Sequence, residues 1–440
     1  MENIESVWTN NIEKPKFESL KEDIDCDILV IGGGMAGVLA AHTLQQRGVD
    51  VVLVEADEIG CGITKNTTAV ITAQHDALYA DLIEMHGQKV AKAYLDANLL
   101  AVENYKRMAE QIDCDFKVEP SYMYSLDYDL GFELDALKSL GYDAAELTDA
   151  TGLPFPIKSA VKYPDMASFH PLKFLYAVAK TLKIYEHVRV LNIKGHTAIA
   201  ENCRIRFNRA VVATHFPFLD KRGLFFVKMY QERSHVIAIE NASDVKGTYV
   251  EYSDSGFYFR NHGNLLIVGK GDHRTGTQTD AFEQLKDFAA QFYPQSEIKY
   301  MWSNQDCVTL DGLPYVGMYG GLKDVFVISG FNLWGMSNSM AAATLIADLL
   351  EGKGNEHYDA FRTDRSVLRK QLFVNLGVTV KNLLTPTLKR CSHLGCALKH
   401  NSLENSWDCQ CHGSRFAPDG KLLDSPANHG IKHPETLDGV

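Results

Sequence analysis

The N-terminal part of the chain alternates between short apolar runs and longer stretches of helix-forming residues. Residues 27–31 (Asp-Ile-Leu-Val-Ile) are apolar and β-branched and predict a strand. Residues 38–47 are good helix formers that end at Gly48, and the apolar run at 51–54 predicts a second strand. Strand, helix and strand in this order predict an α/β fold with a parallel sheet.

The middle of the chain changes its period twice. Apolar residues recur every three or four positions between residues 76 and 113, which predicts helix. Short alternating runs bounded by Gly, Asn and Asp then predict an antiparallel sheet between residues 221 and 269. The predicted strands are Phe225 to Met229, Ser234 to Ala238, Gly247 to Tyr252, Gly256 to Arg260 and Leu265 to Val268.

A glycine motif connects the first predicted strand to the first predicted helix. In Gly32-Gly-Gly-Met-Ala-Gly37, Gly32 permits a tight turn and Gly34 lets a pyrophosphate approach the backbone. Gly37 allows the helix to pack closely against the strand. Glu55, at the end of the second strand, would accept hydrogen bonds from ribose hydroxyls and would repel the 2′-phosphate of NADP. The motif therefore predicts a dinucleotide site.

Further segments distinguish FAD from NAD. They are a small-polar loop at 56–69, Val188 to Val190, Ala210 to Thr214, Thr309 to Gly317 and Val325 to Ser337. In these segments the chain resembles the D-amino-acid oxidase and glycine oxidase family of flavin oxidoreductases, over about residues 22–352. The resemblance implies FAD, held in a Rossmann-like domain that is interleaved with an antiparallel substrate sheet. No second glycine motif follows a strand, so NAD(P)H is a less expected reductant.

The resemblance also implies a division of the chain and a set of FAD contacts. The FAD-binding segments are expected at about 24–75, 155–220 and 300–352, and the substrate layer at about 76–154 and 221–299. Besides Gly32, Gly34, Gly37 and Glu55, the expected contacts are Met35, Ala36, Ala56, Gly62, Thr67, Thr68, Val190, Ala213, Gly330, Gly335 and Met336.

Two positions depart from the family pattern. Glycine oxidase-like sequences have a carboxylate-binding arginine where this chain has Asp306, so an amine or another neutral or cationic substrate becomes a candidate. Arg233, Arg260 or Arg274 could still hold a carboxylate, although each is also typical of a solvated surface residue, and Asp306 of a turn or cap. Asn66 stands where some relatives attach FAD covalently to histidine, so non-covalent FAD is expected.

Cysteines crowd near the end of the chain. Five of the nine are scattered, but Cys391, Cys396, Cys409 and Cys411 lie within 21 residues, which favours a metal site over a disulfide framework. The same segment carries His393 and His412 at Cys-x-His and Cys-x-x-His spacing. A Cys2His2 zinc site could use the same four ligands.

This pattern strongly resembles the Rieske iron–sulfur motif. The resemblance implies that Cys391 and Cys409 hold one iron, that His393 and His412 hold the other, and that Cys396 and Cys411 form a disulfide. It also implies a hydroxyl donor at Ser414. Residues 353–385 are expected to form a helical connector, and residues 386–440 a small all-β Rieske module that leans on the flavin domain.

Composition and charge narrow the partners. The chain has 44 Lys and Arg against 56 Asp and Glu, a net charge of −12, and no basic run interleaved with aromatics, which argues against nucleic acid. The apolar stretch at 340–350 is about eleven residues long, whereas a membrane span needs about 20. With no secretion signal at Met1, a cytoplasmic location without a membrane span is expected.

Together the motifs predict a dehydrogenase. A small amine-like or amino-acid-like substrate would reduce FAD, and electrons would pass through the Rieske cluster to an external acceptor. Two alternatives stay open, namely an O2-using oxidase with a structural cluster and a non-catalytic redox carrier or sensor.

Overall fold

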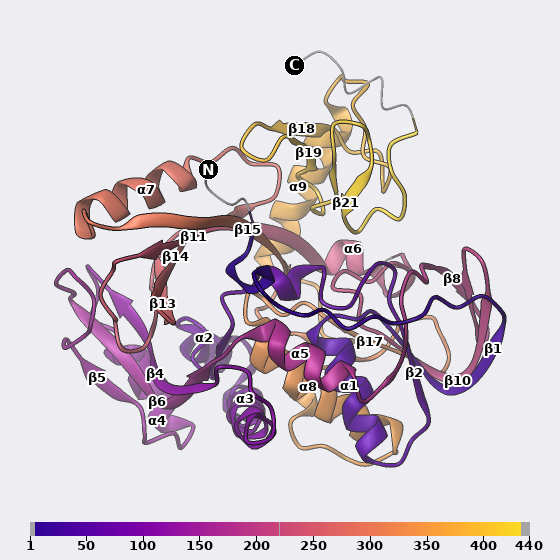
Figure 1. Ribbon diagram of the computed structural model, residues 1–440, viewed down its shortest axis with the longest axis horizontal. Helices are drawn as coiled ribbons and strands as arrows, with labels where there is room; N and C mark the ends of the chain where they lie inside the picture. The colour runs from indigo at the N-terminus through magenta and orange to yellow at the C-terminus, as the bar shows by residue number, and fades with distance from the viewer. Residues whose placement is uncertain (1–4, 220, 433–440) are drawn as a thin grey trace.

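The computed structural model describes residues 5–219 and 221–432, which form three sheets with helices packed between and around them (Figure 1). Two large sheets make up the body. A small third sheet near the C-terminus lies above β11 and β15 in Figure 1. No helix within these described residues is long and apolar enough to cross a membrane.

The first sheet has eight strands in the order β16-β17-β10-β1-β2-β7, with β9 joining β10 and β8 joining β9. Its strands are β1 (Ile24–Ile31), β2 (Val51–Val54), β7 (Lys183–Tyr185), β8 (Val190–Lys194), β9 (Thr197–Ala200), β10 (Arg204–Val212), β16 (Tyr315–Met318) and β17 (Val325–Ser329). The core strands β2, β1, β10 and β17 are parallel. α1 (Met35–Gln46) packs between α5 (Pro171–Ala179) and α8 (Gly335–Leu350). The predicted strand–helix–strand unit is confirmed.

The second sheet has nine strands in the order β15-β11-β14-β13-β12-β4-β6-β3, with β5 beside β6. Its strands are β3 (Val70–Ile71), β4 (Lys117–Ser125), β5 (Glu146–Thr148), β6 (Ser159–Ser168), β11 (Met229–Glu240), β12 (Thr248–Glu251), β13 (Tyr258–His262), β14 (Leu265–Arg274) and β15 (Glu297–Thr309). β11 lies antiparallel between β14 and β15, which places Glu232 opposite Asp306. This sheet contains the predicted antiparallel strands, although β12 pairs with β4 in parallel.

Helices and short 3-10 turns fill the spaces around the sheets. They are α2 (Leu78–His86), α3 (Gln88–Ala109), α4 (Gly131–Ser139), α6 (Phe225–Lys228), α7 (Ala281–Phe292), α9 (Lys370–Leu384), η1 (Val7–Thr9), η2 (Ile63–Asn66), η3 (Arg222–Leu224) and η4 (Tyr358–Ala360). The helix predicted over residues 76–113 is two helices, because Gly87 has φ 83° and breaks the run.

The C-terminal sheet is antiparallel and has four strands. They are β18 (Leu398–Asn401), β19 (Ser406–Cys409), β20 (Arg415–Phe416) and β21 (Leu422–Asp424). Half of its eight buried core residues are cysteines: Cys391, Cys396, Leu398, Trp407, Cys409, Cys411, Phe416 and Ala427. Residues 433–440 of the expected module lie outside the described residues.

One strand prediction was wrong, and three strands lie on the other side of the expected boundaries. Phe225–Lys228 forms the short helix α6, and the strand begins only at Met229. A short apolar run has no period that separates strand from buried helix. β3, β6 and β15 join the nine-stranded sheet, although the sequence boundaries placed them in FAD-binding segments.

Candidate functional site

The glycine turn after β1 opens onto a cavity of about 320 Å³. Gly32 has φ +113°, and a Cβ there would lie 2.5 Å from the carbonyl oxygen of Ala213. A Cβ on Gly37 would lie 1.9 Å from the oxygen of Gly32. Both positions therefore require glycine, for the turn and for the close approach of α1, as the sequence predicted.

Glu55 lies at the end of β2 on the same cavity. Its carboxylate accepts the backbone N–H groups of Gly33 at 2.6 Å and Asp57 at 2.9 Å. Burial raises the pKa of Glu55, partly offset by these hydrogen bonds. Its backbone carbonyl accepts the N–H of Val188 at 2.8 Å, which brings the segment 188–191 beside it. The cavity therefore has an acidic group where ribose hydroxyls would lie.

The structure gathers nearly all the expected FAD contacts. Every one lines this cavity except Gly37, which packs behind the turn, and Thr68, which lines the adjoining second cavity. The N-terminus of α8 also opens onto it at Gly335. The glycine cradle, the acidic group and the helix ends fit FAD, and when bound this group accepts two electrons and releases them singly.

The second cavity, of about 90 Å³, adjoins the first beneath the nine-stranded sheet and shares Thr67, Asn304 and Asp306 with it. Asp306 is 6% exposed, and its carboxylate accepts the side-chain N–H of Asn304 at 2.8 Å. Asp76 and Asp272 also line this cavity. Three carboxylates thus surround the space next to the FAD cavity.

Burial of these acids shifts their pKa values upward. Burial raises the pKa of Asp306 to about 7, with the charge of Glu232 adding to the shift. Burial raises the pKa of Asp76 to about 6, although the hydrogen bond from Trp334 lowers it. The pKa of Asp272 is raised by burial and by three neighbouring carboxylates. A bound cation would relieve this repulsion.

A wider cavity of about 990 Å³ continues from the second and shares Asp76, Leu333 and Trp334 with it. We call it the vestibule. The carboxylates lining it are Asp76, Asp81, Asp127, Asp129, Glu232, Glu251 and Asp254. No lysine or arginine of the described chain lines it. Sequence reasoning missed these acids, because they come from separate segments.

The three candidate arginines already make structural contacts. Arg260 lines the second cavity. Its Nη1 donates to the carbonyls of Thr68 and Ala69, at 2.8 and 2.7 Å. Arg233 lies where the body meets the C-terminal module, and Arg274 donates to the backbone of Gln410 at 2.9 Å. Of the three, Arg260 is therefore the one that lines the second cavity.

Two loops bring the predicted iron ligands together. Each loop closes with the same pair of backbone hydrogen bonds, from Cys391 N to Cys396 O and Gly395 N to Cys391 O in the first. In the second, Cys409 N donates to Ser414 O and Gly413 N to Cys409 O. The Sγ atoms of Cys396, Cys409 and Cys411 lie within 4.8 Å of one another. All four cysteines are free thiols here, so the Cys396–Cys411 disulfide stays a prediction.

The two histidines complete the set. The rings of His393 and His412 lie 5.0 Å apart, and Nδ1 of His412 is buried without a hydrogen-bond partner. Burial lowers the pKa of His412 to about 3, which keeps it neutral as a metal ligand must be. Ser414 accepts the Ala427 N–H at 3.0 Å, so its hydroxyl hydrogen can point to a sulfur. These donors fit a Rieske cluster, a one-electron carrier when bound.

Three side chains of the nine-stranded sheet hold the second cluster loop. Gln231 donates to the carbonyls of His412 at 2.8 Å and Ser425 at 2.7 Å. Gln305 donates to the carbonyl of Gly413 at 2.9 Å, and Arg274 to that of Gln410. Gln231 also lines the FAD cavity, as do residues 422–425, 427 and 428 of the module. The module therefore forms part of the FAD cavity wall, which the sequence did not predict.

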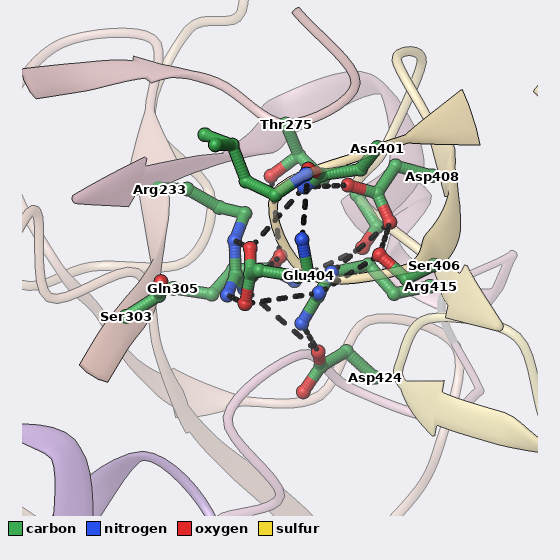
Figure 2. A network of polar contacts seen from close by, with 12 residues as sticks. Arg233, Thr275, Ser303, Gln305, Asn401, Glu404, Ser406, Asp408, Arg415 and Asp424 are labelled. Atoms are coloured by element: carbon green, nitrogen blue, oxygen red, sulfur yellow. Dashed lines mark hydrogen bonds and ion pairs between the residues drawn. The ribbon is translucent and has the colours of Figure 1, made fainter. Parts of the chain in front are cut away.

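A buried charge network fastens the module to the body (Figure 2). Arg233 of β11 pairs with Glu404, and its Nη1 donates to Gln305 at 3.2 Å. Arg415 lies 3.2 Å from Glu404 and pairs with Asp408 at 3.0 Å and Asp424 at 2.9 Å. Arg233 and Arg415 are both nearly inaccessible to solvent. The expectation that the module leans on the flavin domain matches these contacts.

These sites define a flavoprotein with an iron–sulfur module. The chain belongs to the FAD dependent oxidoreductase (DAO) family, whose model matches residues 27–349, and residues 347–435 match the Rieske [2Fe-2S] domain. It is thus an FAD-dependent oxidoreductase with a Rieske domain.

Relatives share one or both parts. The chain is 32% identical to a Bacillus subtilis (strain 168) protein named "Putative Rieske 2Fe-2S iron-sulfur protein YhfW", over 97% of both chains. It is 24% identical to the gamma-glutamylputrescine oxidoreductase of Escherichia coli (strain K12), over 78% of this chain and 88% of that one. The fold resembles L-proline dehydrogenase from P. horikoshii, with a TM-score of 0.64, 17% identity and coverage of 79% and 98% of the two chains.

Proposed function

We propose that the protein is a dehydrogenase that oxidises a small cationic amine and passes the electrons through its Rieske cluster to an external acceptor. The observation that carries the proposal is the shared wall of the FAD cavity. Gln231 lines that cavity and donates to the carbonyl of His412 in the second cluster loop. A module docked in this way is positioned for electron transfer within one chain.

The charge of the second cavity supports an amine over an amino acid. Asp306, Asp76 and Asp272 line it together with the cation Arg260, whose Nη1 already donates to backbone carbonyls, and the vestibule adds further carboxylates. An ammonium group would be attracted to these acids, whereas a substrate carboxylate would be repelled. In the reaction the amine would lose a hydride and a proton and become an imine. The bound FAD, held non-covalently, would take the hydride with its two electrons, and the proton would pass to solvent.

The gamma-glutamylputrescine oxidoreductase relative is named for an amine-containing substrate. That name describes the relative. For this chain, an amine substrate is proposed because of the acidic residues that line its own second cavity.

Matched substrate pairs test the amine assignment. Each pair is an amino acid and the amine made by removing its carboxylate, such as glycine with methylamine or lysine with cadaverine. Under anaerobic mixing, the amine should bleach the flavin at least ten times faster than its partner. An amino acid that bleaches the flavin faster than its own amine would contradict the proposal.

A cluster-ligand variant tests the electron route. In the wild-type protein, freeze-quenched samples should show cluster reduction by EPR after the flavin bleaches. With FAD supplied in excess, Cys391→Ala should still show bleaching of the flavin by the substrate, and the cluster signal should be lost together with turnover by one-electron acceptors. Equal reoxidation of both proteins by O2, at the full turnover rate, would instead indicate an oxidase with a structural cluster.

A further inference from the structure

The connector helix α9 (Lys370–Leu384) turns an apolar face outward. Eight of the 21 exposed large hydrophobic side chains of the described chain fall between residues 368 and 388, and they are 44% to 81% exposed. They are Leu368, Phe373, Val374, Leu376, Val380, Leu383, Leu384 and Leu388. Soluble proteins seldom leave so many apolar side chains together in water, so this face indicates a binding surface.

The inward side of α9 is polar. Asn375 and Asn382 are buried, and the side-chain oxygen of Asn375 accepts hydrogen bonds from Arg274 at 2.8 Å and Gln371 at 3.0 Å. Asn382 donates to Gln410 at 3.3 Å, and its carbonyl accepts the Ala397 N–H at 3.1 Å. Because these asparagines anchor the helix to the body and to both cluster loops, the apolar face cannot simply turn inward.

The segment that carries this face has a net charge opposite in sign to that of the whole protein, although Arg365 at its start is already paired with Asp311. The segment 365–403 contains seven Lys and Arg and no Asp or Glu, although the full chain has a net charge of −12. Lys370 and Lys381 are exposed on one flank of the apolar face, and neither forms an ion pair with any residue in 5–219 or 221–432. An apolar face flanked by lysines is the pattern of a helix that lies in the surface of an anionic membrane.

We propose that the outward face of α9 binds peripherally to the surface of an anionic lipid membrane, without spanning it. Phe373, Val380 and Leu384 would enter the boundary between headgroups and acyl chains. Lys370 and Lys381 would pair with lipid phosphates. A membrane is favoured over a second copy of the chain because two copies would bring the same positive charges together.

Membrane binding would also bring the cluster loops near the lipid surface, since Asn382 contacts both of them. This consequence rests on the proposed function, and it would suit a lipid-soluble acceptor of the quinone class. Membrane binding itself does not depend on the proposed function, so a failed test of either proposal leaves the other standing.

Vesicle flotation of the full-length protein tests the proposal. Vesicles of phosphatidylcholine with about one third phosphatidylglycerol should carry the wild-type protein, and pure phosphatidylcholine should carry at least fivefold less. The double variant Phe373→Glu/Val380→Glu should lower the partition coefficient more than tenfold. Lys370→Gln and Lys381→Gln should each lower it about fivefold on the anionic vesicles, since one lysine near such a surface is worth about 1 kcal/mol.

A matched variant separates this face from general hydrophobicity. Leu100 is 40% exposed on α3 (Gln88–Ala109), so Leu100→Glu should float like the wild type. Flavin absorbance and melting temperature should be the same in all variants, because only exposed side chains change. Absence of flotation for the wild type on anionic vesicles would overturn the proposal. The proposal would also be overturned if light scattering showed that the wild type is a dimer, and if Phe373→Glu/Val380→Glu made it a monomer without changing flotation.

Discussion

Asp306 is the residue at which the chain departs most clearly from an amino-acid-binding site. It occupies the position where the family resemblance implies an arginine, and it lies 6% exposed between the FAD cavity and the second cavity. The acids around it are Glu232, Asp272 and Asp76, and Arg260 is the cation on the same lining. Its protonation therefore controls the charge that a substrate meets.

The raised pKa of Asp306, about 7, predicts a pH-dependent affinity for cations. A quaternary ammonium inhibitor has a fixed charge, so only the protein titrates. Its inhibition constant should fall about tenfold as the pH rises from 6 to 8, because Asp306 becomes charged. In Asp306→Asn the constant should stay high and change little with pH. Unchanged pH dependence in this variant would assign the titration to another group.

The carboxyl group of Asp306 should also lower the stability of the folded protein at alkaline pH. The folded protein keeps its proton up to about pH 7, whereas the unfolded chain loses it near 3.8, so stability falls as the pH rises between these values. Asp306→Asn should therefore stabilise the protein at pH 8 by on the order of 1–2 kcal/mol. Asp311→Asn is the control, since Asp311 pairs with Arg365 at 2.8 Å, and its loss should cost about 3–5 kcal/mol. Thermal melting at pH 5 and pH 8 measures both effects.

Among single residues, the sequence predicted those that belong to a local motif. It missed those that reach the site only because distant strands pair. Gly32, Gly37 and Glu55 belong to one continuous strand–helix–strand unit, so their spacing was sufficient. Gln231 and Glu232 reach the site only because β11 pairs with β15 across about 75 residues of sequence. The run of polar residues at 231–235, in a strand that is buried along most of its length, was the available signal.

Among the elements, the second cluster loop depends most on its neighbours. Gly413 has φ +92°, and a Cβ there would lie 2.5 Å from the side chain of Gln231. Gly395, in the first loop, has φ +77° but open space around it. The two loops thus share a backbone pattern but differ in what surrounds them.

Gly413→Ala should therefore reduce iron binding more than Gly395→Ala does. Both variants strain a left-handed residue, by about 1–3 kcal/mol, but only the first also pushes Gln231 away from the loop. Iron content and the EPR signal of the reduced protein measure occupancy. Equal iron content in the two variants would mean that the contact with Gln231 does not support the loop.

Arg233 links strand β11 to the module, and its loss should loosen the module before the body. In Arg233→Met, Glu404 keeps Arg415 at 3.2 Å as its remaining ion-pair partner, together with the hydrogen bond from Asn401. We expect the module to lose about 2–3 kcal/mol of local stability, because a buried carboxylate loses one of its two cations. Hydrogen exchange in β18 and β19 should accelerate accordingly. Arg206→Met, which removes an exposed pair with Asp25, should leave exchange there unchanged.

The secondary structure predicted from the sequence was mostly correct where a segment was long or ended at a turn. The strand prediction for Phe225–Met229 failed because four apolar residues and one lysine suit a strand or a buried turn of helix equally. The assignment of β3, β6 and β15 to the nine-stranded sheet depends on pairing between distant segments, which no local pattern records.

At the scale of the whole molecule, we expect the small C-terminal module to depend on its metal for stability. Four of its eight core residues are cysteines, and its four strands contain two to four residues each. So little apolar surface seldom supports a fold, and a metal that binds the folded state supplies the missing stability. The body, in contrast, has large cores of its own beneath both main sheets.

Removing iron should therefore unfold the module and leave the flavoprotein body folded. Protein prepared with a chelator should become sensitive to protease after about residue 385, while the flavin absorbance of the body changes little. Calorimetry of the iron-loaded protein should lose its module transition after the same treatment. Because residues of β21 and the following loop wall the FAD cavity, FAD affinity should fall several-fold in the iron-free protein. A module that resists protease equally with and without iron would mean that the Arg233 network and the contacts of Gln231 hold it by themselves.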